Sequence, residues 1–157
     1  MNIFETQYEL IRRSRESLFT YCESMSSEDY LKKIDPFGGI SIPALHTHVA
    51  DGYRVWLGNR ALGKSIPKVN SRSIVNVENM REVFKDTDEL VYEFLKEFKD
   101  RWDPTTKASW HSSSAEQTEL WLFTHTTTHE YHHRGQIVKI GSHLGYVPPK
   151  LNLPKPL

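Results

Sequence analysis

The feature that most constrains the fold is the helical spacing of apolar residues over long stretches of the chain. Residues 3–24, 41–61 and 77–101 each place apolar side chains three or four positions apart, and a fourth such stretch ends near residue 144. No segment shows the sustained alternation that is typical of strands. The sequence therefore predicts an all-α protein whose leading architecture is a four-helix bundle.

Capping residues and glycines predict where these helices begin and end. Ser41, followed by Pro43, favours a helix start, and Gly63 lies just past the expected end near residue 61. The last helix is expected to begin at Ser113 or Ser114, with Glu116 in its first turn, and to stop before Gly145. Between the first two long helices, "SSEDYLKKI" predicts a short helix capped by Ser26 or Ser27, and "DPFGG" ends it.

The chain of 157 residues has the size of one domain, so we expect a single helical domain over residues 1–157. Residues 64–76 are polar and loop-like, which suits a long crossover connection rather than a tight turn. Residues 146–157 are rich in proline and are expected to form a tail over the surface.

The charge balance argues against a general nucleic-acid binder. Lys and Arg total 20 and Asp and Glu total 20, so there is no excess of basic residues to follow a phosphate backbone. The N-terminal stretch carries charges every few residues and has no apolar core of the length that a signal peptide or membrane span needs. We therefore expect a cytoplasmic protein that does not bind membranes. Its one cysteine, Cys22, is expected to be a small buried apolar residue.

The stretch "HEYHHRGQI" at 129–137 gathers three of the eight histidines of the chain. His129 and His133 are four residues apart, so on a helix their imidazoles share one face and lie near enough to share an ion. His125 continues the stripe, but it lies about 12 Å from His133 along the helix axis, too far for the three to bind one metal. His132 points about a quarter turn away from His133.

A mononuclear site needs a further ligand from another helix, and "LHTHVADGYRVW" offers His46 and His48. Their side chains point in nearly opposite directions, and we expect His48 to face inward and His46 to lie on the surface. His48, His129 and His133 together would give three neutral nitrogens and leave coordination positions open, which suits Zn²⁺, Ni²⁺ or Fe²⁺. The spacing alone fits equally well with histidines that are ordinary polar residues of a helix.

The segments "HVADGYRVWL" (48–57) and "HEYHHRGQI" (129–137), together with "GYVPP" near the end, resemble the DinB/YfiT family over nearly the whole chain. The resemblance implies that His48, His129 and His133 bind a divalent metal, with zinc or nickel expected first and iron or manganese next. It also implies an up-down-down-up bundle and a homodimer. The family often has an acidic or other polar residue where Tyr53 stands.

Four residues beside the histidines need interpretations of their own. Glu130 fits the letters H-E-x-x-H, so a zincin-like role as a general base is an alternative. Arg134 would pair with a carboxylate of a neighbouring helix or anchor an anionic substrate. Gly135 would allow a close helix approach. Gln136 would hold a ligand imidazole or only cover polar surface.

Aromatic residues form the last group of candidates. Trp56, Trp102, Trp110 and Trp121 are expected to lie mostly in the core, with some of them lining an apolar cleft beside the metal.

The resemblance implies a metal-dependent enzyme that acts on a small molecule, either a hydrolase or a transferase that uses a low-molecular-weight thiol. The alternative is a non-catalytic, metal-binding stress-response protein.

Overall fold

The computed structural model describes residues 1–99, 118–148, 150 and 153. These residues form helices and no strand, which confirms the all-α prediction. The elements are α1 (Ile3–Glu23), α2 (Ser27–Leu31), η1 (Asp35–Phe37), α3 (Ile42–Tyr53), η2 (Arg54–Ala61), η3 (Ser71–Ser73), α4 (Val77–Glu97) and α5 (Glu119–His143). None of the helices in these residues is long and apolar enough to cross a membrane.

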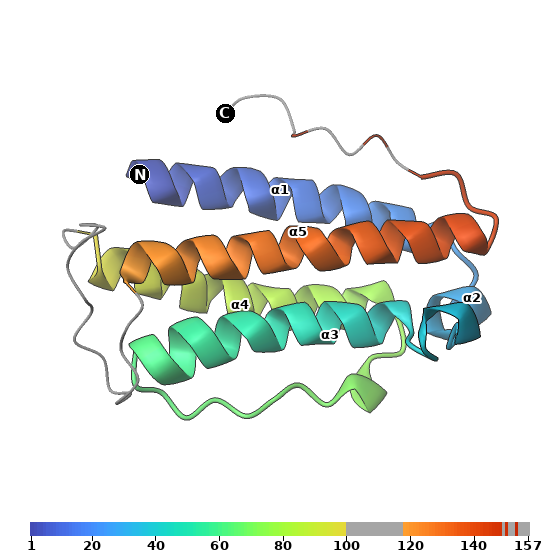
Figure 1. The fold of residues 1–157 in the computed structure, drawn as a ribbon, viewed down its shortest axis with the longest axis horizontal. Coiled ribbons are helices and arrows are strands. Elements are labelled where there is room, and N and C mark those ends of the chain that lie inside the picture. The colour runs from blue at the N-terminus through green and yellow to red at the C-terminus, as the bar shows by residue number, and fades with distance from the viewer. Residues whose placement is uncertain (100–117, 149, 151–152, 154–157) are drawn as a thin grey trace.

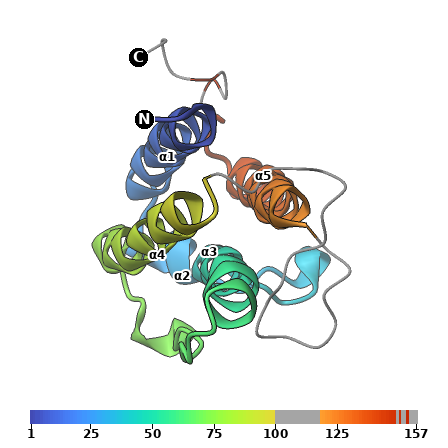
Figure 2. The ribbon, with the colours of Figure 1, turned by 90° about the vertical axis from the view of Figure 1, so that its left-hand side faces the viewer.

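The long helices lie side by side around a shared core (Figures 1 and 2). Figure 1 shows α1 and α5 running in one direction, and α3 and α4 running in the opposite direction. Because α3 and α4 point the same way, residues 62–76 run back along the outside of the molecule to join them, with η3 near their end. This connection falls on the segment that the sequence assigned to a crossover.

Side-chain caps set the helix starts. Ser26 caps α2, and Ser41 caps α3 with a proline in its first turn, as predicted. The predicted caps of the last helix, Ser113 and Ser114, lie outside the described residues. The predicted start is wrong, because Thr118 caps α5 and accepts a hydrogen bond from the Trp121 backbone at 3.1 Å. A threonine followed by an acidic first turn is a sufficient start signal, so α5 begins about five residues later than expected. Helix α4 ends at Glu97, earlier than the predicted residue 101.

The second long helix changes its winding halfway along. Helix α3 passes into η2, a π-helical stretch in which the Leu62 N–H bonds to the carbonyl of Leu57 at 3.1 Å. Gly63 follows with φ of 66°, a left-handed conformation that suits glycine and ends the helix. The end near residue 61 is therefore as predicted, whereas the wider winding had no signature in the pattern.

The buried core is formed by apolar faces of all the long helices. Tyr8, Phe84, Leu95, Leu122 and Ile137 are among the side chains that are almost completely buried. The expectation that the tryptophans lie in the core is wrong for Trp121, which is 42% exposed. Leu122 and Phe123 turn into the core instead, so their neighbour projects outward from α5.

Trp56 is partly buried, while Trp102 and Trp110 lie outside the described residues, as does most of the proline-rich tail.

The expected close helix approach at Gly135 is also wrong. A Cβ atom added to Gly135 would meet nothing within 4 Å, and the residue is exposed. A Cβ atom on Gly141 would collide with the hydroxyl of Tyr21, so Gly141 is where α5 lies tightly against α1.

Candidate metal centre

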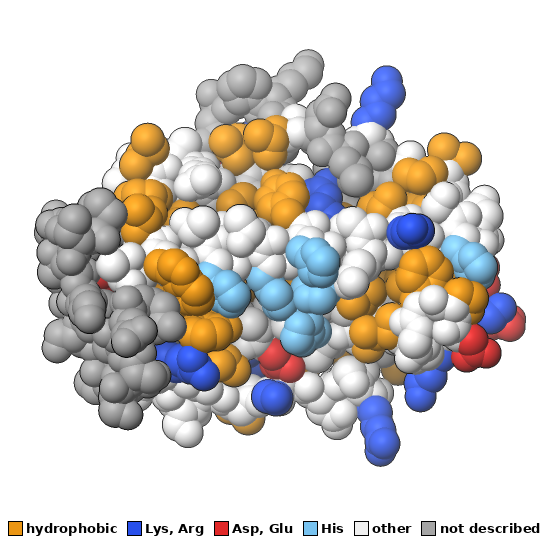
Figure 3. Space-filling model, viewed as in Figure 1, with side chains coloured by type: hydrophobic (Ala, Val, Ile, Leu, Met, Phe, Trp, Pro, Cys, Tyr) orange, Lys and Arg blue, Asp and Glu red, His pale blue; other side chains and the backbone are white. Residues whose placement is uncertain are grey.

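The structure brings His48 of α3 together with His129 and His133 of α5. One nitrogen of each ring lies within 4.8 Å of the corresponding nitrogens of the other two. The Nε2 atom of His129 is 3.1 Å from Nε2 of His48 and 3.1 Å from Nε2 of His133. Figure 3 shows histidines grouped near the middle of one face of the molecule. We call His48, His129 and His133 the histidine trio.

Helix packing explains how the trio forms. His129 and His133 are one turn apart on α5, and α3 packs along the same side of that helix. Gly52 follows His48 by one turn on α3. A Cβ atom on Gly52 would lie 3.0 Å from Nδ1 of His129. The missing side chain of Gly52 therefore lets the His129 ring approach the backbone of α3.

The spacing of the nitrogens fits a shared divalent ion. Nitrogen ligands at about 2.0–2.1 Å from one tetrahedral ion are separated from each other by about 3.3 Å. The two Nε2 separations of 3.1 Å are close to this value. The candidate donor set is thus three imidazole nitrogens within 4.8 Å of one another, with no carboxylate among them.

Gln136 holds one of these rings in the orientation and tautomer that a metal ligand needs. The Nδ1 atom of His133 lies 2.6 Å from Oε1 of Gln136. Since a carbonyl oxygen only accepts, Nδ1 carries the proton and the lone pair stays on Nε2, which faces His129. Of the two interpretations of Gln136, the structure supports the one in which it holds a ligand imidazole.

The environment keeps these rings neutral. Burial lowers the pKa of His129 to about 4, with further lowering by the neighbouring histidines. Burial also lowers the pKa of His133, partly offset by the bond to Gln136. Because a metal binds the unprotonated imidazole, both lone pairs are available at neutral pH.

The predicted directions of His46 and His48 are reversed in the structure. His48 is exposed, whereas His46 is only 2% exposed and packs against the rings of Phe19 and Phe84. Helix α3 has its most buried side toward the other helices, and the trio forms at its edge against α5, where His48 is exposed to solvent. Two residues along a helix turn the side chain by about 200°, so the two histidines cannot share a face.

Beside the trio, further rings extend the stripe along α5. His125 lies 6.2 Å from His129 and stacks on Trp121 at 4.7 Å between ring centroids. The ring of Trp56 meets the rings of Trp121 and His125 edge to face. The guanidinium of Arg60 lies 4.0 Å from the ring centroid of Trp56. His132 is exposed and lies outside the trio, as expected.

Glu130 belongs to the core rather than to the trio. Arg15 of α1 donates to both of its carboxylate oxygens, at 2.6 and 3.1 Å, and the hydroxyl of Tyr53 donates to one of them at 2.5 Å. A second carboxylate, Asp88 of α4, accepts from Arg15 at 2.7 Å. These bonds direct the Glu130 carboxylate to α1 and Tyr53 rather than to the histidine trio, so a zincin-like role of Glu130 as a general base is not supported.

One feature of the sequence indicates this network, although it belongs to none of the histidine motifs. Arg15 stands four residues after Ile11 and three before Leu18, and both of those apolar residues are core positions. An arginine on the apolar stripe of a helix needs a buried acidic partner. Burial opposes the charge of Arg15, but Glu130, Tyr8 and Asp88 outweigh this effect and raise its pKa.

Arg134 does not form the expected ion pair. Its side chain is buried, it donates to the hydroxyl of Ser14, and no carboxylate of the described residues pairs with it. Burial lowers its pKa. The anionic-substrate interpretation is also unsuited to a side chain that lies in the core.

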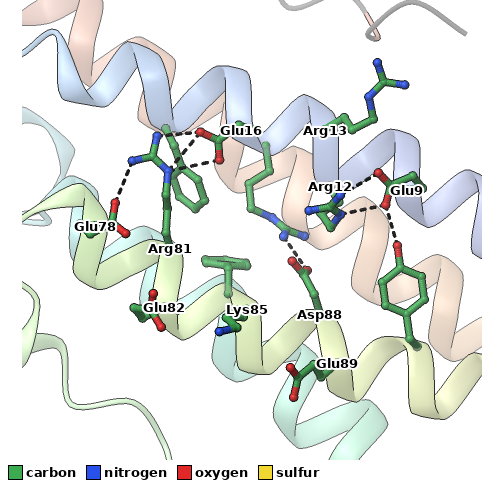
Figure 4. A pocket seen from close by; sticks show the side chains of 14 residues that line it. Glu9, Arg12, Arg13, Glu16, Glu78, Arg81, Glu82, Lys85, Asp88 and Glu89 are labelled. Atoms are coloured by element: carbon green, nitrogen blue, oxygen red, sulfur yellow. Dashed lines mark hydrogen bonds and ion pairs between the residues drawn. The ribbon is translucent and has the colours of Figure 1, made fainter. Parts of the chain in front are cut away.

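A charged groove lies between α1 and α4 and is lined by neither α3 nor α5 (Figure 4). Its charges are largely paired with one another: Arg12 with Glu9, Arg81 with Glu16, and Arg15 with Asp88. The pair of Arg81 with Glu16 joins α4 to α1 at the surface, where such a pair stabilises the interface only modestly. Arg15 is buried and belongs to the core instead.

Comparison with models of protein families identifies the family of the chain. A family model described as the DinB family matches residues 1–157, the whole chain, which agrees with the resemblance seen in the histidine motifs. The comparison with curated proteins found no match.

Proposed function

The chain belongs to the DinB family, and on that premise we propose that His48, His129 and His133 hold one divalent metal ion and form the active centre of a metal-dependent enzyme. The observation that carries the proposal is that three imidazole nitrogens lie within 4.8 Å of one another, with Nε2 of His129 3.1 Å from Nε2 of each of the other two rings. Zinc or nickel fits a set of three imidazoles best, with iron and manganese as the next candidates.

The reaction class follows from the neutrality of the ligands. Three imidazoles leave the charge of the ion uncompensated, and the bound ion would lower the pKa of a water or thiol and polarise the substrate. We propose hydrolysis, or transfer of a low-molecular-weight thiol to a small electrophile. His129 and His133 would fix the centre from α5, while exposed His48 lies on the side from which a small molecule can approach.

The rings beside the trio support a small organic substrate. Trp121 is 42% exposed and stacks on His125, so a flat surface lies next to the proposed ion. An apolar part of the substrate would contact these rings, and Arg60 at the ring of Trp56 would favour a negatively charged group. The nucleophile would come from solvent or from a cosubstrate, because Cys22 is buried.

The finer description of the fold is part of the same proposal. A single DinB-like bundle with up-down-down-up topology is supported by the helix directions in Figure 1 and by the outer course of residues 62–76. A homodimer is supported by the family resemblance and by an apolar groove between α1 and α5, lined by Leu10, Ile11 and Tyr131 among others. Sedimentation equilibrium tests the dimer. The cytoplasmic location stays a prediction.

Metal analysis tests the centre directly. Purified protein should carry close to one zinc or nickel per chain in elemental analysis, and the stripped protein should take up one equivalent in calorimetric titration. His133→Ala should abolish this uptake, while His132→Ala, a change to the exposed neighbouring ring, should leave it intact. Equal loss from both folded variants, or no uptake by the wild type, would exclude the centre.

Activity is tested separately from binding. A thiol-conjugation and ester-hydrolysis screen should show turnover that disappears on chelation and returns with the metal. If the protein binds metal and shows no turnover with any substrate, the alternative of a non-catalytic, metal-binding stress-response protein is favoured. Turnover that survives chelation would contradict a metal-dependent mechanism.

A further inference from the structure

A small cavity lies inside the molecule between α1, α3 and α5. Four polar residues and several apolar residues line it, namely Arg15, His46, Glu130 and Arg134, with Leu18 and Val49 among the apolar ones. The centre of a water-sized sphere can move through about 10 Å³ of it. That is close to the smallest space that holds one water molecule.

Two side chains that line this cavity have polar atoms without a protein partner. Both ring nitrogens of His46, and Nε and Nη2 of Arg134, are buried and bond to no other atom of the described residues. The two side chains are only 2% and 6% exposed, so bulk water does not reach them. Leaving buried groups unsatisfied costs about 1–3 kcal/mol each, and more for a charged group. The cavity therefore needs an occupant that forms hydrogen bonds.

The arrangement of donors and acceptors selects the occupant. Arg134 offers only N–H donors, whereas a neutral His46 offers one donor and one acceptor. Water can accept from Arg134 and also donate to the lone pair of the imidazole. An anion could not donate, and the carboxylate of Glu130 in the same wall would repel it. We propose that this cavity binds one ordered water molecule that bridges Arg134 of α5 to His46 of α3.

The bridge would lie behind the metal centre. His46 precedes His48 by two residues on α3, and Arg134 directly follows His133 on α5. The water therefore joins, from inside the core, the two helices that meet at the histidine trio on the outside. It requires no metal and no substrate, so it goes beyond the proposed function and stands or falls independently of it.

A crystal structure of the wild-type protein, grown with and without bromide, tests the occupant. We expect one isolated density peak about 2.7–3.2 Å from a nitrogen of Arg134 and from a nitrogen of His46. The peak should show no anomalous signal after bromide is added. A dry cavity, a bromide signal at this position, or direct protein partners for both side chains would overturn the proposal.

Magnetic relaxation dispersion of water provides the test in solution. The wild type should show a long-lived internal water whose contribution is lost in His46→Leu. His132→Leu is the matched control, because it removes the same ring from an exposed position of α5 and should keep the signal. Arg134→Met provides a second loss variant if His46→Leu does not fold. A signal that persists in a folded core variant would contradict the bridge.

Discussion

Helix α5 has two polar faces that differ in almost every physical respect. The outer face presents His129 and His133, which are neutral, partly exposed and complementary to an ion. The inner face presents Glu130 and Arg134, which are buried among groups from α1 and α3. Each histidine is directly followed by a residue of the inner face, Glu130 or Arg134, so a small rotation of α5 would disturb both faces at once.

The contrast shows that the two faces have different tasks. A buried ion pair such as Arg15 with Glu130 contributes little net stability, because removing both charges from water costs about as much as their attraction returns. It does impose a single arrangement, since any shift would leave a charge unsatisfied. We infer that the inner face sets the position of α5 against α1 and α3, and that the outer face relies on this position for its geometry.

Glu130→Ala should have the largest effect of all, and it acts on the inner face. Removing the carboxylate leaves Asp88 as the one carboxylate that pairs with Arg15 among the described residues, and it takes the acceptor from Tyr53. Loss of one partner of a buried pair costs about 3–5 kcal/mol, and we expect that decrease in the free energy of unfolding. Urea denaturation measures it.

A surface ion-pair cluster provides the control for this change. Arg81 contacts Glu16, Glu23 and Glu78, and all three carboxylates are about half exposed or more. Arg81→Ala should therefore cost at most about 1 kcal/mol. If both variants lose the same stability, burial is not what distinguishes the network around Glu130.

On the outer face, Gln136→Ala should weaken metal binding without unfolding the protein. The variant removes the acceptor for Nδ1 of His133, so the ring loses its fixed tautomer and orientation. Residues that hold a metal ligand in this way typically contribute about 10–100-fold in affinity. Calorimetric titration with zinc measures the change. An unchanged affinity would show that His133 is oriented by packing alone.

Two glycines, one beside the trio and one exposed on α5, should respond differently to the same substitution. An alanine Cβ at Gly52 would lie 3.0 Å from His129, so Gly52→Ala should displace the ring and lower metal affinity. At exposed Gly135 the added Cβ meets nothing. Gly135→Ala should raise stability by up to about 1 kcal/mol through helix propensity and leave affinity unchanged. Reversed effects on affinity would exclude Gly52 as the contact that positions His129.

How much of the site and of the inner network can be predicted from the sequence depends on how far apart the contacting residues stand along the chain. The spacing of His129 and His133 is local, and the resemblance to the DinB family supplied His48. The inner network joins residues that are 115 positions apart, as in Arg15 with Glu130, and no periodicity reports such a pairing. The directions of His46 and His48 were assigned wrongly because both neighbour apolar residues, and only the packing of α3 decides which side is buried.

The smallest expected effect concerns Cys22, which lies on neither face of α5. Its side chain is 1% exposed, and burial, with a smaller effect from Glu23, raises the pKa of its thiol to about 12. Only about one thiol in 10⁴ would be ionised at pH 8, and the thiolate is the reactive form. A disulfide reagent should therefore leave the native protein unlabelled at pH 8 and label it fully in urea. Cys22→Ser should bind metal as the wild type does, because the trio contains no sulfur. Rapid labelling of the native protein, or metal loss in the folded variant, would place this thiol in the chemistry of the outer face and would contradict a nucleophile supplied from outside the chain.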